Sequence, residues 1–183
     1  MKEVDASRPD ATWGSAVSID VGTGYTHKTP RPEDHAVFRH ILVPTDFTPT
    51  SARALSLGIE MARHFGARLT LLHSYEIPVL AYAAMEYASG NLATHVEQAA
   101  RAELDTALQG VRAQLPQADA VLREGDPWRE ILATVDEIHA DLVIVGTHGR
   151  RGLSHALLGS TADKIARLAH VPVMTVHDED TPT

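Results

Sequence analysis

The 183-residue sequence contains no cysteine, which excludes disulfide bonds, thiolate metal sites and cysteine nucleophiles. Aromatic residues make up only 5% of the chain, whereas hydrophobic residues make up 44%, so the core is predicted to be aliphatic. No apolar run approaches the length of a membrane span, and no basic region followed by an apolar run stands at the N-terminus. The formal net charge of −8 disfavours nucleic-acid and membrane surfaces as partners. We therefore expect a cytoplasmic protein.

Composition divides the chain into a flexible N-terminal arm, residues 1–37, one domain, residues 38–178, and an acidic tail, residues 179–183. Within the domain, five short apolar segments alternate with four segments of helical periodicity, which predicts a parallel sheet covered by helices on both faces. The strands are predicted at 40–46, 67–78, 118–125, 141–145 and 171–177, and the helices at 51–66, 92–115, 127–140 and 160–170.

Helix ends carry their own signals. Thr48, Thr50 or Ser51 is predicted to cap the first helix, with Gly66 at its C-terminal end. Asp126 is predicted to cap the third helix, because Pro127 follows at the favoured first position. The second helix is predicted to run as far as Pro116.

The strongest functional signal lies at residues 141–161, DLVIVGTHGRRGLSHALLGST. A buried strand stops at Gly146, Gly149 follows, and Gly159, Ser160 and Thr161 open a helix. Glycines allow a close approach of the backbone to an anion, and a helix start offers unpaired N–H groups to phosphate. The structural alternative is that the glycines only end a strand and begin a helix.

This segment resembles the nucleotide-binding signature of universal stress proteins, whose ATP-binding branch carries G-x2-G-x9-G-[ST]. Gly146, Gly149, Gly159 and Ser160 fill every fixed position, and the resemblance covers roughly residues 40–177. It implies an α/β, Rossmann-like fold of the adenine nucleotide alpha hydrolase type, with a five-stranded parallel sheet in the order 3-2-1-4-5. It also implies a stress-response signalling module that binds ATP or a related adenine nucleotide, with or without Mg²⁺.

On the base side of such a site, the resemblance places Pro44 and Asp46 against the adenine. Asp46 could instead only cap the first helix. Ser74 would form a second wall, where family members often have valine, so this wall is less apolar than usual. Val145 and Gly146 would lie along the ribose and base.

On the phosphate side, the resemblance places Gly149 under the α-phosphate and Gly159, Ser160 and Thr161 against the remaining phosphates. Arg150 would either contact phosphate or remain a solvated loop charge. Eleven histidines invite a metal hypothesis, but none of their spacings forms a recognisable ligand set.

Sequence features of an efficient enzyme are missing. The chain has no G-x4-G-K-[ST] loop, no G-x-G-x-x-G after the first strand, no carboxylate pair and no nucleophile beside an evident base. The loop PTDFTPTS also lacks the glycines of pyrophosphate-releasing ATP enzymes. A binding module is therefore favoured. Slow ATP hydrolysis or nucleotidyl transfer, and an interaction protein with an empty pocket, stay open as alternatives.

The final predicted strand, residues 171–177, suggests an assembly. As the last strand of an open sheet it would present unpaired backbone groups at its outer edge. Pro172 could protect that edge, because proline has no N–H to donate. In the resembled family this strand pairs with its two-fold mate, so we predict a homodimer.

Overall fold

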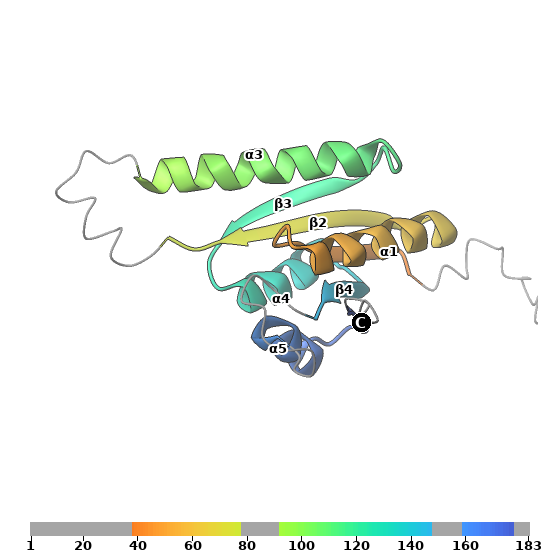
Figure 1. Ribbon diagram of the computed structural model, residues 1–183. Coiled ribbons are helices and arrows are strands. Elements are labelled where there is room, and N and C mark those ends of the chain that lie inside the picture. The colour runs from red at the N-terminus through yellow and green to blue at the C-terminus, as the bar shows by residue number, and fades with distance from the viewer. Residues whose placement is uncertain (1–37, 78–91, 148–158, 178–183) are drawn as a thin grey trace, which may run out of the picture.

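The structure is a computed structural model that describes residues 38–77, 92–147 and 159–177. Its five parallel strands lie in the order β3-β2-β1-β4-β5 (Figure 1), which confirms the fold expected from the sequence. The predicted arm, the predicted tail, Gly149 and Arg150 lie outside the described residues. The strands are β1 (His40–Pro44), β2 (Arg68–Tyr75), β3 (Asp119–Glu124), β4 (Leu142–Gly146) and β5 (Val173–Val176).

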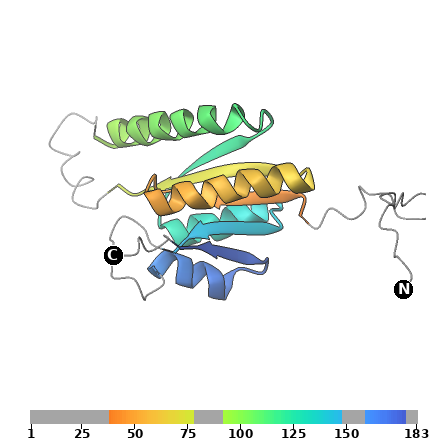
Figure 2. The same cartoon turned by 45° about the vertical axis from the view of Figure 1, so that its right-hand side comes forward.

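Helices cover both faces of the sheet (Figure 2). One face packs against α1 (Pro49–Phe65) and α3 (Leu92–Arg112), and the other against α4 (Pro127–Ile138) and α5 (Ser160–Leu168). Alternate residues of β1 supply the two cores, with Ile41 and Val43 on the α1 side and Leu42 on the α4 side. Because β1 is buried along its whole length, its sequence is an apolar run rather than an alternating one.

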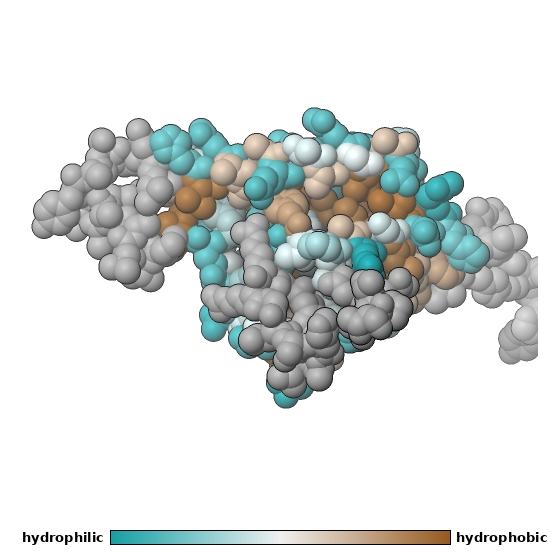
Figure 3. Space-filling view, in the orientation of Figure 1, coloured by the Kyte–Doolittle hydropathy of each residue, from teal (hydrophilic) through white to brown (hydrophobic). Residues whose placement is uncertain are grey.

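The distribution of hydrophobic and hydrophilic residues on the surface agrees with this layered arrangement. Hydrophobic residues gather between α3 and α1, and hydrophilic residues line the outer side of α3 (Figure 3). β3 is half-buried along most of its length at one edge of the sheet, which agrees with its more polar sequence. No helix of the described residues is long and apolar enough to cross a membrane.

The ends of α1 confirm their predicted caps. Thr48 accepts a hydrogen bond from the Ser51 N–H through its side chain, and Gly66 adopts the left-handed conformation with φ of 65°. Glycine suits this position because a Cβ there would be strained.

Other helix ends differ from the predictions. Asp126 occupies the N-cap position of α4, but its side chain makes no cap hydrogen bond. Its backbone carbonyl instead accepts the N–H groups of Arg129 and Glu130. α3 ends at Arg112, and residues 113 and 114 form a turn before Pro116 is reached. α5 ends at Leu168 rather than at residue 170.

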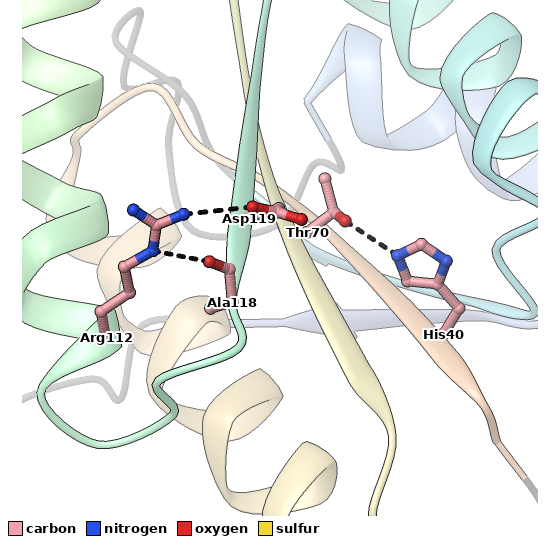
Figure 4. Close-up of polar contacts among 5 residues, drawn as sticks. All are labelled: His40, Thr70, Arg112, Ala118 and Asp119. Carbon is pink, nitrogen blue, oxygen red and sulfur yellow. Dashed lines mark hydrogen bonds and ion pairs between the residues drawn. The ribbon is translucent and has the colours of Figure 1, made fainter.

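A buried histidine joins three elements at the end of the sheet where the parallel strands begin. His40 Nδ1 donates to the Ile138 carbonyl at 2.9 Å, and Nε2 accepts from the Thr70 hydroxyl at 2.8 Å (Figure 4). Both bonds suit the neutral ring, since a carbonyl can only accept. Burial lowers the pKa of His40, and Arg68 lowers it further, against the raising effect of the Ile138 carbonyl and Asp141.

The same end of the sheet holds a second clamp, between α3 and β3. Arg112 donates from Nε to the Ala118 carbonyl at 2.8 Å and from Nη2 to Asp119 at 3.1 Å (Figure 4). This bidentate contact ties the last turn of α3 to the start of β3. These contacts join helices and strands at the end of the sheet where the strands begin.

Candidate functional site

The strand order reverses its direction of winding between β1 and β4. From β1 the chain proceeds outward through β2 and β3, and it then returns to the other side of β1 to form β4 and β5. Ligands of open α/β sheets bind at such a switch point. Pro44 ends β1, and Val145 and Gly146 end β4, so three of the predicted site residues lie at this switch point.

The loop after β1 is held by its own side chains. Asp46 Oδ1 accepts the Thr48 backbone N–H at 3.1 Å and the Thr48 hydroxyl at 2.6 Å. Thr48 in turn is the N-cap of α1. One carboxylate oxygen of Asp46 therefore supports the residue that caps α1. Asp46 is half-buried in the loop that follows β1.

Phe47, next in this loop, has a strained backbone. Its φ of 63° lies in the left-handed region, which costs a residue with a side chain roughly 1–2 kcal/mol. The Phe47 N–H donates to the Thr45 hydroxyl at 3.1 Å. The Phe47 ring rests on the His73 ring, with centroids 4.5 Å apart. The residue with the left-handed backbone thus packs its ring against β2.

Gly146 is required by a close approach between β4 and α1. A Cβ at this position would lie 3.0 Å from Thr50 Cγ2, 3.1 Å from the Thr50 backbone carbon and 3.2 Å from the Ser51 nitrogen. Backbone atoms of a helix cannot move aside easily, so any side chain would push β4 away from the first turn of α1. The first glycine of the motif thus allows β4 to lie close to the first turn of α1.

Thr147 connects β4 to both β5 and α5. This buried residue donates its N–H to the Val176 carbonyl at 2.9 Å, and its own carbonyl accepts the Gly159 N–H at 2.7 Å. Gly159 is the N-cap of α5 and, among the described residues, no side chain caps this helix end. Ser160 is exposed and Thr161 half-buried. The amino end of α5 is thus anchored beside Gly146 with its first-turn N–H groups unmatched by a side-chain cap, as an anion site requires.

The structure therefore gathers most of the predicted site at one edge. Ser74 is half-buried near the carboxyl end of β2. The sequence did not indicate that Phe47, His73 and Thr147 contribute to this region. Thr147 could have been identified, because it directly follows the motif glycine that ends β4. No group of three or more histidine or acidic residues suited to a metal occurs within 38–77, 92–147 and 159–177.

Comparison with known proteins agrees with this architecture. The chain is 33% identical over 141 residues to a Thermus aquaticus universal stress protein, with 76% of this chain and 99% of that relative covered. The Lactobacillus plantarum universal stress protein UspA superposes with a TM-score of 0.59 at 23% identity, covering 75% of this chain and 97% of that one. A universal stress protein in complex with cAMP superposes with a TM-score of 0.53 at 26% identity, covering 76% and 97%.

A family model adds the extent of the match. The model described as the universal stress protein family matches residues 38–177, which is most of the chain. The chain therefore belongs to the universal stress protein family.

Proposed function

We propose that this chain binds an adenine nucleotide, with ATP as the first candidate, and acts as a signalling module in the stress response. The observation that carries the proposal is the amino end of α5, held beside Gly146 by the hydrogen bond from Gly159 to Thr147. The similar protein in complex with cAMP supports an adenine nucleotide as the ligand class.

On the base side, Pro44 and Asp46 would line the adenine, with Ser74 as a second wall. Gly146 would lie along the ribose and base with Val145, and its lack of a side chain lets its backbone lie close to Thr50 of α1. One oxygen of Asp46 is held by Thr48, which orients the carboxylate. An oriented carboxylate can accept hydrogen bonds from a base without a further loss of side-chain entropy.

On the phosphate side, the N–H groups of the first turn of α5 and the Ser160 hydroxyl would donate to phosphate oxygens, with Thr161 beside them. A bound nucleotide supplies negative charge, and the positive end of the helix dipole stabilises that charge. Gly149 and Arg150, outside the described residues, complete the proposed set.

We further propose that β5 forms a homodimer with a second copy. The carbonyl of Pro172 accepts the N–H of Val143 in β4, and that of Val176 accepts the N–H of Thr147 just after β4. The backbone groups of Val173 and Thr175 therefore face away from β4. Pro172 precedes β5 and faces β4, so it does not protect the free edge as the sequence suggested. Among the described residues, the exposed large hydrophobic side chains are Leu168 at 57% and Met174 at 36%, both in this part of the chain.

A substitution at Gly159 tests the phosphate assignment. Gly159→Val would place a branched side chain where phosphate approaches, and we expect ATP binding to weaken by about 1–3 kcal/mol, the scale of lost hydrogen bonds to a charged group. The fold should persist, because the φ of −58° and ψ of 149° at Gly159 are accessible to valine.

Calorimetric titration with ATP provides the measurement, and Gly110→Val on α3 is the matched control. A Cβ at Gly110 meets nothing within 4 Å, so this variant should bind ATP as the unmodified protein does. Unchanged affinity of folded Gly159→Val would refute the phosphate assignment.

Release of ADP from ATP in the same samples would favour the slow enzyme over the signalling module. Mass spectrometry of ligand released from freshly purified protein would identify the cellular nucleotide.

A further inference from the structure

We infer that His73 is a positioning residue of the nucleotide site, which holds the loop of residues 45–48 so that Asp46 faces the base. The inference rests on the proposed function and adds to it a residue that does not itself need to touch the ligand. His73 lies on β2, is only 6% exposed and is not part of the glycine motif. Its ring contacts the loop at two points.

The first contact is a hydrogen bond to the residue before Asp46. His73 Nδ1 lies 2.8 Å from the Thr45 carbonyl oxygen in a buried setting. Because a carbonyl oxygen only accepts, the hydrogen of the neutral ring must be on Nδ1, and Nε2 carries the lone pair. Thr45 also donates its N–H to the Leu72 carbonyl at 2.8 Å, so β2 holds both the N–H and the carbonyl of Thr45.

The second contact is with the residue after Asp46. The Phe47 ring packs on the His73 ring at 4.5 Å with an interplanar angle of 44°. Phe47 has a positive φ, which a free loop would avoid, so this packing retains the chain in an otherwise unfavourable turn. The two contacts lie on either side of Asp46, which fixes where the backbone of that residue stands. The Thr48 hydrogen bonds then fix its carboxylate.

Three substitutions separate these contacts. In His73→Asn, the amide nitrogen can take the place of Nδ1 and keep the donor, whereas in His73→Gln the amide lies near the position of Nε2. His73→Phe keeps a ring against Phe47 but has no donor. We expect His73→Gln and His73→Phe to weaken ATP binding by about threefold to tenfold, the scale of one hydrogen bond, and His73→Asn to bind more tightly than His73→Gln.

Two readouts distinguish positioning from a general loss of structure. Affinity for inorganic tripolyphosphate should stay within about twofold in all three variants, since the phosphate side is built by α5 and not by the loop. The preference for ATP over GTP should fall in His73→Gln and His73→Phe, because Asp46 would no longer be held against the base. A general loss of structure would instead weaken the binding of ATP and tripolyphosphate together and leave the preference for ATP over GTP unchanged.

In the unmodified protein, nitrogen NMR of the ring adds a test that needs no variant. It should show the hydrogen of neutral His73 on Nδ1, and a ring with its hydrogen on Nε2 would overturn the inference. Folded variants with unchanged ATP affinity and unchanged ATP preference would also overturn it, as would equal losses for ATP and tripolyphosphate. If the unmodified protein binds neither ATP nor AMP, the proposed function itself fails, which is a separate outcome.

Discussion

Gly58 and Gly110 offer the same substitution in two different surroundings. Both lie inside long helices, Gly58 in α1 and Gly110 in α3. A Cβ at Gly58 would lie 2.7 Å from Val43 Cγ2 and 3.4 Å from Leu69 Cδ1, whereas a Cβ at Gly110 meets nothing within 4 Å. Replacement by alanine should therefore have opposite effects on stability at the two positions.

The magnitudes follow from two opposing contributions. Alanine in place of glycine inside a helix gains about 1 kcal/mol, so Gly110→Ala should stabilise the protein by that amount. At Gly58 the extra methyl also overpacks the core, which costs about 1–3 kcal/mol, so the net change is a loss of about 0–2 kcal/mol. Val43 cannot move aside easily, because it is fully buried and its χ1 angle is restricted.

Shortening Val43 should turn the loss of stability caused by Gly58→Ala into a gain. Val43→Ala alone should cost about 2 kcal/mol through lost burial and the cavity that it leaves. In that background Gly58→Ala meets no clash and fills part of the cavity, so it should stabilise by about 1 kcal/mol. Urea unfolding of the single and double variants measures the coupling. If Gly58→Ala and Gly110→Ala stabilise the protein equally when Val43 is retained, the close packing of α1 on β1 is refuted.

Three further predictions concern the base pocket, the edge strand and pH. Asp46→Ala should reduce affinity for ATP in calorimetry while tripolyphosphate binding stays nearly unchanged; equal losses would indicate a role with Mg²⁺ or a disrupted site. Thr175→Pro removes a donor that faces away from β4, so light-scattering chromatography should show a shift to monomer, and an unchanged, folded dimer would place the interface elsewhere. Because the folded pKa of His40 is lowered, the unfolded chain binds the proton first as pH falls. Stability should therefore be level above about pH 7 and fall below about pH 6.5, by at most ~1.4 kcal/mol per pH unit for this group. His40→Gln, which can keep the Thr70 contact, should flatten that slope in urea unfolding, and an unchanged slope would assign it to other groups.

Local signals in the sequence were sufficient for the elements and their order of appearance. β1 and β4 are continuous apolar runs because both of their faces are buried, and periodicity located the four helices that the structure describes. Thr48 and Gly66 also act as predicted, since a cap depends on groups within a few residues. The strand order came from the family resemblance and not from composition.

Predictions failed where a helix end depends on more than its own residues. Asp126 had the right residue type and a following proline, yet its carboxylate makes no cap bond in the folded chain. The early end of α3 places Arg112 where it can reach the Ala118 carbonyl and Asp119, contacts that only form once β3 is in the sheet.

The sequence by itself determined which residue types were available to the site, and only the tertiary structure decided which of them meet. His73 is 28 positions from the Thr45 carbonyl that it binds, and His40 is 98 positions from Ile138. The need for glycine at position 146 is likewise set by the backbone of α1, which no motif spacing contains. Buried polar groups must find partners wherever the fold brings them, so such contacts follow from the packing of distant strands and helices and not from neighbours in the chain.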